Sequence, residues 1–184
     1  TSIQARRRLE PITAPTAGYY GRVEHEYQRM GALAYLAAWD VQNAKIFGLC
    51  RANTGIDRFH ELVDHVMGQE PYRSAQRVFW ITDNGPSHRG QTSIDRLKKW
   101  YPNAIQVHTP VHASWLNQIE IYFSVLQQKI LTPNDFESLA ELECRIRAFQ
   151  TEYEKVSKPF EWKFTQDDLK KVLAKFDNEQ KLAA

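Results

Sequence analysis

The spacing of apolar residues predicts five helices. In each, apolar side chains recur three or four residues apart, which places them on one face of an α-helix. A Thr54/Asp57 pair and a Ser138/Glu141 pair predict the starts of the first and fourth helices, and Pro102 ends the second. The five apolar faces are Phe59, Leu62, Val63, Val66 and Met67; Ile94, Leu97, Trp100 and Tyr101; Leu116, Ile119, Phe123, Leu126 and Ile130; Leu139, Leu142, Ile146, Phe149 and Tyr153; and Leu169, Val172, Leu173 and Phe176.

Shorter segments follow strand patterns. Residues 32–39 and 45–51 are rich in aromatic and β-branched side chains and are separated by a short polar connection, which favours an antiparallel hairpin. Residues 32–38 could equally be written as a helix. Residues 77–82 form a continuous apolar run, typical of a strand buried on both faces, and residues 104–108 form a second short strand candidate.

Strands and helices alternate after the hairpin. This order predicts an α/β fold in which helices pack on the faces of a mixed sheet. At 184 residues, with 42% hydrophobic residues, the chain is long enough for one core. We therefore expect a single domain over residues 1–184, with residues 156–184 as an extension packed on that core.

Charge and cysteine content constrain the function only loosely. A net charge of +2 permits nucleic-acid binding without demanding it. Cys50 and Cys144 have no metal-ligand spacing, which fits a reducing compartment. The sequence shows neither a long apolar span nor a secretion signal, so we expect a cytoplasmic protein.

Two carboxylates stand beside predicted core segments. Asp83 directly follows the apolar run 77–82, at the strand end where active crevices of α/β sheets lie, although Asp-Asn-Gly is also ordinary turn chemistry. Glu120 lies at the shoulder of the apolar face that begins at Leu116, where an amphipathic helix also begins its solvated side. Together the two are suitable ligands for Mg²⁺ or Mn²⁺, but they are one ligand short of a comfortable site.

Three segments resemble a known family. They are Asp83-Asn-Gly-Pro-Ser-His88, then His108-Thr-Pro with Ala113-Ser-Trp-Leu-Asn-Gln-Ile-Glu120, then Lys158-Pro-Phe-Glu-Trp162. The chain resembles the catalytic domain of DDE transposases of the mariner-like insertion-sequence group. The resemblance implies an RNase H-like, integrase-like fold in which three acidic residues bind two Mg²⁺ (or Mn²⁺) ions. Asp83 matches the second acidic position and Glu120 the third.

The resemblance also implies partners and a missing ligand. Its partners would be double-stranded DNA, as transposon ends and target, and a second copy of the chain in the active complex, acting in the bacterial cytoplasm at the nucleoid. Residues 1–5 look like those that follow the family's first acidic motif, so the first strand is expected to be truncated and its aspartate to precede Thr1. Asp40, Asp57 and Asp64 are poor substitutes by position. The family's upstream DNA-binding helices are not in this sequence.

Further residues are weaker candidates. Asn84 and Asn117 are expected to hydrogen-bond the carboxylates, and His88 to orient a phosphate or a water near them, although His88 could instead bond backbone in its loop. Arg6, Arg7 and Arg8 are expected to contact DNA phosphates. His108 and His112 have a zinc-like spacing, but Pro110 breaks the helix that such a site would need. Trp115, Trp162 and Phe164 are expected to be packing residues.

The predicted function is metal-dependent cleavage and transfer of DNA strands at insertion-sequence ends. Because one ligand is missing, the 184-residue chain alone is expected to bind metal weakly and to cut poorly. Two alternatives remain open. One is a plain RNase H-like nuclease or resolvase, and the other is a DNA-binding remnant of a transposase that has lost its chemistry.

Overall fold

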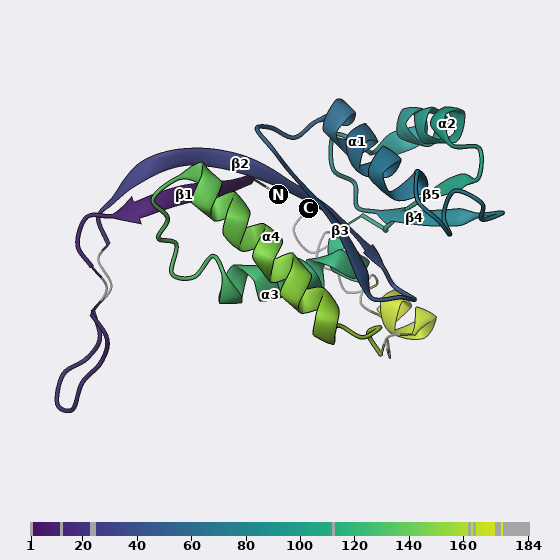
Figure 1. The fold of residues 1–184 in the computed structure, drawn as a ribbon. Helices are drawn as coiled ribbons and strands as arrows, with labels where there is room; N and C mark the ends of the chain where they lie inside the picture. Colours follow the sequence, from purple (N-terminus) through teal and green to yellow (C-terminus); the bar gives the residue numbers. More distant parts are fainter. Residues whose placement is uncertain are drawn as a thin grey trace, which may run out of the picture.

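The structure is a computed structural model that describes residues 2–11, 13–22, 25–111, 113–161, 163, 165–171 and 174. Strands and helices alternate along the chain, which confirms the predicted α/β class (Figure 1). In order, the elements are β1 (Ser2–Arg8), β2 (Tyr27–Asp40), β3 (Lys45–Arg51), α1 (Ile56–Met67), β4 (Val78–Thr82), α2 (Gly90–Trp100), β5 (Ala104–His108), the 3₁₀ turn η1 (Ser114–Leu116), α3 (Ile119–Lys129) and α4 (Leu139–Val156).

Strands β1, β2 and β3 form an antiparallel sheet in that order. The hairpin prediction for residues 32–51 is confirmed, and the helical alternative for residues 32–38 is excluded, because β2 pairs with β3 from Ala34 to Asp40. Strand β2 begins earlier than the pattern predicts, since its first half pairs with β1. The register shifts between Ala5 and Arg6, opposite Gly31, whose φ of 106° is a conformation that favours glycine.

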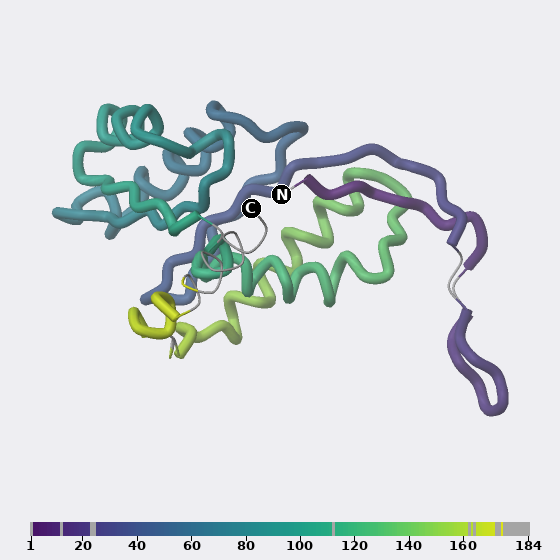
Figure 2. The backbone as a smooth tube through the Cα atoms, turned by 180° about the vertical axis from the view of Figure 1, so that it is seen from behind, coloured from purple at the N-terminus to yellow at the C-terminus, as the bar shows by residue number. Residues whose placement is uncertain are grey.

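The paired ends of β1 and β2 project beyond the helices. Figures 1 and 2 show them as a curved ribbon that continues into a thin loop between the two strands. Isolated bridges join Thr13 to Arg22 and Thr16 to Tyr19 in this loop. Tyr19 and Tyr20 are strongly exposed near its tip. The ribbon therefore carries aromatic surface away from the main body of the protein.

Strands β4 and β5 form a separate two-stranded parallel sheet. Within the described ranges, the expected mixed sheet is thus divided into an antiparallel and a parallel part. The expectation that residues 77–82 are buried on both faces is wrong, because Phe79 is 61% and Ile81 49% exposed. Among the described residues, helices cover this small sheet on one face, and the face that carries Phe79 and Ile81 stays open.

Two apolar cores lie on opposite sides of the antiparallel sheet. The first packs residues of β1, β2 and β3, such as Tyr35 and Ile46, against α3 and α4. The second packs Phe47 of β3 against α1, β4 and α2. Because the two cores share β3, the small sheet with α1 and α2 is held against the larger one, as Figure 1 shows.

The two predicted capping pairs have different outcomes. Ser138 accepts a hydrogen bond from the Glu141 N–H at 3.1 Å and begins α4, as predicted. The Thr54/Asp57 pair is wrong, because Gly55 occupies the N-cap of α1 and no side chain caps this end. Thr54 is one residue too early to reach the first free amides of the helix.

Helix α3 begins later than the apolar pattern predicts. Leu116 belongs to the 3₁₀ turn, and the helix starts at Ile119. The most buried residue of α3 is Tyr122, whose hydroxyl lies 3.0 Å from that of Tyr35. The pattern misses Tyr122 because its polar hydroxyl is paired inside the core rather than at the surface.

The chain after α4 contacts the β2–β3 turn. The Ser157 hydroxyl donates to the Ala44 carbonyl at 2.7 Å, and the ring of Phe160 stacks on Trp39 with centroids 5.0 Å apart. Residues 166–171 are helical. The other predicted packing positions there, Trp162, Phe164, Val172, Leu173 and Phe176, lie outside the described residues.

None of the helices in the described part of the chain is long and apolar enough to cross a membrane.

Candidate active site

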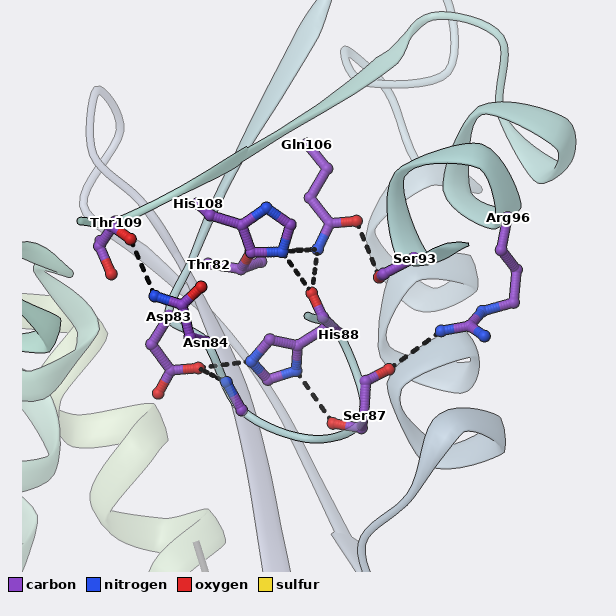
Figure 3. Close-up of polar contacts among 11 residues, drawn as sticks. Thr82, Asp83, Asn84, Ser87, His88, Ser93, Arg96, Gln106, His108 and Thr109 are labelled. Atoms are coloured by element: carbon purple, nitrogen blue, oxygen red, sulfur yellow. Dashed lines mark hydrogen bonds and ion pairs between the residues drawn. The ribbon is translucent and has the colours of Figure 1, made fainter. Parts of the chain in front are cut away.

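Asp83 is the first residue after β4, and two donors hold one of its oxygens. The Gly85 N–H donates to Asp83 Oδ1 at 3.0 Å. His88 Nε2 lies 2.5 Å from the same oxygen and donates to it, since a carboxylate only accepts (Figure 3). The hydrogen bonds that the structure gives the Asp83 carboxylate in the described chain all reach Oδ1. The other oxygen, Oδ2, is therefore available to a ligand.

The loop that carries Asp83 is fastened to its neighbours by polar contacts. The Asn84 side-chain amide donates to the Thr109 carbonyl at 2.9 Å, just beyond the end of β5. The Arg96 guanidinium of α2 donates to the Ser87 carbonyl at 3.1 Å. Figure 3 shows these contacts on opposite sides of the loop. Such a loop holds its carboxylate more rigidly than a free turn would.

Gly85 lets the His88 ring approach Asp83. A Cβ placed on Gly85 would lie 2.9 Å from His88 Cε1 and Nε2 and 3.1 Å from Asp83 Oδ1. These distances are shorter than normal carbon contacts. The Asn-Gly-Pro sequence thus does more than end the strand, because its glycine makes room for the hydrogen bond between His88 and Asp83.

Glu120 reaches the same region from another element. It lies in the first turn of α3, and a series of tight turns from Pro110 onward delivers it there. The Thr109 N–H donates to the Thr82 carbonyl at 2.8 Å, so this connection starts beside the end of β4. The ends of two neighbouring strands therefore bring the Asp83 loop and the N-terminus of α3 together.

The charges of the two carboxylates interact. Burial and then repulsion from Asp83 raise the pKa of Glu120 above its ordinary value. Burial also acts to raise the pKa of Asp83, but the hydrogen bonds from His88 and Gly85 outweigh it and lower that pKa. The half-buried Asp83 and the more exposed Glu120 repel each other, and a cation bound between them would convert this repulsion into attraction.

The donor set fits a divalent cation in part. Carboxylate oxygens are the ligands that Mg²⁺ and Mn²⁺ prefer. However, the described residues contain no group of three or more His, Cys, Asp or Glu side chains that could hold a metal ion. Asp83 and Glu120 are thus two oxygen donors of a suitable type, one acidic side chain short of such a group.

Of the three alternative acidic residues, Asp40 and Asp64 are hydrogen-bonded to other groups, and Asp57 lies elsewhere. Asp40 accepts bonds from the N–H groups of Gln42 and Asn43 and from the Tyr72 hydroxyl. Asp64 accepts from the Tyr101 hydroxyl at 2.6 Å. Asp57 lies in the first turn of α1, on the other side of the larger sheet from α3. The low expectation for all three follows from their positions.

Other candidates from the sequence are placed less directly. The Asn117 carbonyl accepts the Glu120 N–H at 3.0 Å, and none of the hydrogen bonds found in the described chain uses the Asn117 side chain. Arg7 pairs with Glu137 at 3.4 Å, and the Arg6 guanidinium lies 4.4 Å from the centre of the Tyr27 ring. Both lie in the half of β1 that pairs with the start of β2, toward the projecting ribbon. His112 falls outside the described residues.

The sequence reasoning missed the residues behind the loop. Gln106 of β5 is only 6% exposed, and its side chain contacts Ser93, Thr82 and the His88 carbonyl. One signal could have revealed it. In Ala104–His108 the polar Gln106 alternates with Ile105 and Val107, so a strand that buries Gln106 must satisfy it with polar partners.

Comparison with known families identifies the chain. The family model described as DDE superfamily endonuclease matches residues 2–143, which includes both Asp83 and Glu120. The chain belongs to this family. No curated protein and no solved structure matched it. Membership of this family agrees with the mixed α/β fold and implies nuclease chemistry in general.

Proposed function

We propose that the chain is the catalytic domain of a transposase that cleaves DNA strands at the ends of an insertion sequence and joins them to target DNA, with Mg²⁺ or Mn²⁺ as cofactor. The proposal is supported by the interaction between the charges of Asp83, directly after β4, and Glu120, at the start of α3. Membership of the DDE superfamily endonucleases supports it. Such an enzyme acts on DNA in the bacterial cytoplasm.

Each carboxylate has a separate task in this proposal. Asp83 offers Oδ2 to a cation, while His88 and Gly85 hold Oδ1 and fix the direction of the carboxylate. Glu120 offers a second oxygen ligand from the start of a helix, whose dipole favours a negative charge. A divalent cation bound there would supply an activated water and charge stabilisation at the phosphodiester.

The third acidic ligand is proposed to lie before Thr1. Two strand edges support this position. Strand β2 pairs with β1 up to Ala34, and in the described residues its far half, 35–40, pairs with β3 alone. Strand β4 pairs with β5 alone among the same residues. A strand that continues β1 backwards would run along the open edge of β2.

DNA and a second copy of the chain are the proposed partners. Arg6, Arg7 and Arg8 lie on β1, where phosphate oxygens would compete with Glu137 for the exposed Arg7. Homodimer formation is supported by the projecting loop, whose exposed Tyr19 and Tyr20 are the kind of side chain that interfaces favour. Sedimentation of the wild-type chain and of a Tyr19→Ser/Tyr20→Ser variant, with and without DNA, tests this part.

A joining assay separates the proposed function from its alternatives. The longest reading frame that contains the chain is incubated with Mg²⁺, a plasmid and labelled duplexes from the DNA that flanks the gene. The duplexes end in either a 3′-hydroxyl or a 3′-dideoxy nucleotide. A transposase joins only the 3′-hydroxyl duplex to the plasmid. Cleavage without joining would instead identify a nuclease or resolvase, and DNA binding without either reaction would identify a non-catalytic remnant.

A further inference from the structure

Gln106 occupies a position where a strand normally carries an apolar side chain. It lies on the face of β5 that packs on α2, and it is 6% exposed. Burying an amide is unfavourable unless its donors and acceptor are hydrogen-bonded. A polar residue kept at such a place needs either a structural or a functional reason, and its partners distinguish the two.

The partners of Gln106 satisfy the whole amide. Its Oε1 accepts from the Ser93 hydroxyl at 2.9 Å. Its Nε2 donates to Thr82 Oγ1 at 3.1 Å and to the His88 carbonyl at 2.7 Å. Ser93 is 2% exposed. The side chain therefore joins the end of β4, the first half of α2 and the end of the Asp83 loop, as Figure 3 shows.

A second donor reinforces the contact at the loop. His108 Nε2 lies 2.6 Å from the same His88 carbonyl. Because a carbonyl only accepts, this nitrogen carries a proton. Two side chains of β5, Gln106 and His108, thus hold one backbone oxygen of the loop.

The fixed backbone directs the His88 ring at Asp83. With its carbonyl held from β5, His88 turns its ring the other way, where Nε2 meets Asp83 Oδ1 and Nδ1 lies 2.9 Å from the Ser87 hydroxyl. The Phe59 ring lies against it with centroids 5.0 Å apart. A chain of contacts therefore runs from Gln106 through His88 to the proposed metal ligand.

We propose that Gln106, assisted by His108, is a positioning residue that sets the Asp83 carboxylate through the backbone and ring of His88. The role rests on the proposed function, because it concerns the same metal site. Without the Gln106 amide, the His88 carbonyl keeps one donor and the loop gains freedom. The hydrogen bonds to Asp83 Oδ1 then form a smaller fraction of the time, and Oδ2 is presented to the cation less well.

The test compares two substitutions in the 184-residue chain that each remove a buried hydrogen bond. Gln106→Met removes the tie to His88 and keeps the side-chain length. Ser93→Ala removes the Ser93 bond to Gln106 and leaves the tie to His88 in place. The readouts are thermal unfolding, the dissociation constant of Mn²⁺ added alone, and hydrogen exchange of the Gly85 amide, which donates to Asp83 Oδ1 in the absence of metal.

Both variants are expected to unfold at lower temperature than the wild type. Gln106→Met is expected to weaken Mn²⁺ binding about tenfold and to speed Gly85 exchange, whereas Ser93→Ala changes neither by more than about twofold. Equal Gly85 exchange in the two variants would overturn the proposal. If Gln106→Met does not fold, Gln106→Glu replaces it, because the glutamate keeps the acceptor for Ser93 and loses the donor to His88.

The exchange measurement separates this inference from the proposed function. If neither the wild-type chain nor the longest reading frame that contains it binds Mn²⁺, the proposed metal site fails. The Gly85 amide still reports whether Gln106 positions Asp83. If Mn²⁺ binds equally well to the wild type and to Gln106→Met, and Gly85 exchange is unchanged, the metal site stands and the positioning role is wrong.

Discussion

Replacing Gly85 by alanine should weaken the candidate metal site without disturbing the rest of the fold. The added Cβ would lie 2.9 Å from two atoms of the His88 ring and 3.1 Å from Asp83 Oδ1. Carbon atoms prefer a separation of about 3.5 Å or more, so the ring must retreat by roughly 0.5 Å. Phe59 and the held His88 carbonyl limit that movement. The backbone of Gly85 is outside the left-handed region, so alanine adds no backbone strain there.

The size of the effect follows from the bond between His88 and Asp83. A hydrogen bond to a charged group contributes about 1.5–3 kcal/mol, and partial exposure of both side chains reduces this to about 1 kcal/mol. A loss of that size corresponds to about a fivefold weaker affinity for a cation that depends on the orientation of Asp83. Urea unfolding should show a similar loss of stability.

The assay measures Mn²⁺ binding by the signal of the free ion in electron paramagnetic resonance. The matched control is Pro86→Ala, which changes the next, exposed residue of the loop and leaves the space at Gly85 unchanged. Gly85→Ala is expected to bind Mn²⁺ about fivefold more weakly than Pro86→Ala. If the two variants bind Mn²⁺ equally and unfold at the same urea concentration, the contact of His88 with Asp83 does not support the site.

Three further substitutions test the electrostatics and the fold. Burial and Asp83 raise the pKa of Glu120, so the ionisation of Glu120 opposes folding. Glu120→Gln should therefore raise the melting temperature of the metal-free chain at pH 7. This gain should vanish below about pH 4, where Glu120 is protonated in the folded and unfolded states alike. Although Asp83 is partly buried, hydrogen bonds lower its pKa, so the ionised carboxylate stabilises the fold. Asp83→Asn should therefore lower the melting temperature at pH 7. This loss should shrink as the pH falls through the lowered pKa of Asp83. If Glu120→Gln melts below the wild type and Asp83→Asn melts above it at pH 7, the directions of both pKa shifts are contradicted. Ser138→Ala removes the cap of α4 and should cost about 1 kcal/mol in urea unfolding, whereas an unchanged midpoint would show that the cap is not needed.

Local patterns in the sequence predict much of this fold. The Ser138 cap, the β2–β3 hairpin and the end of β4 at Asp83 all follow from short-range chemistry, and each is present in the structure. Strand β1 does not follow from short-range chemistry. Three successive arginines hide its alternation of polar and apolar residues, and its pairing with β2 depends on residues distant in the sequence. Long-range pairing is not encoded in the spacing of neighbours.

The candidate site, like the fold, is predictable only in part from the sequence. The strand-end position of Asp83 and the helix position of Glu120 are readable from the sequence, but their mutual repulsion depends on how the tight turns after Pro110 fold back. Burial is also reversed in β5, where Gln106 faces the core and Ile105 and Val107 are exposed. An apolar pattern assigns the opposite faces, because it contains no information on the polar partners that satisfy Gln106.

The most direct test of the central claim is nicking of supercoiled plasmid DNA by the longest reading frame that contains the chain. We expect nicking that requires Mg²⁺ or Mn²⁺, and we expect Asp83→Asn and Glu120→Gln each to slow it by about a hundredfold or more. Asp95→Asn, the same change at an exposed position of α2, should nick at the wild-type rate. If Asp83→Asn nicks as fast as Asp95→Asn, the account of Asp83 and Glu120 as the acidic ligands of a DNA-cleaving site is contradicted.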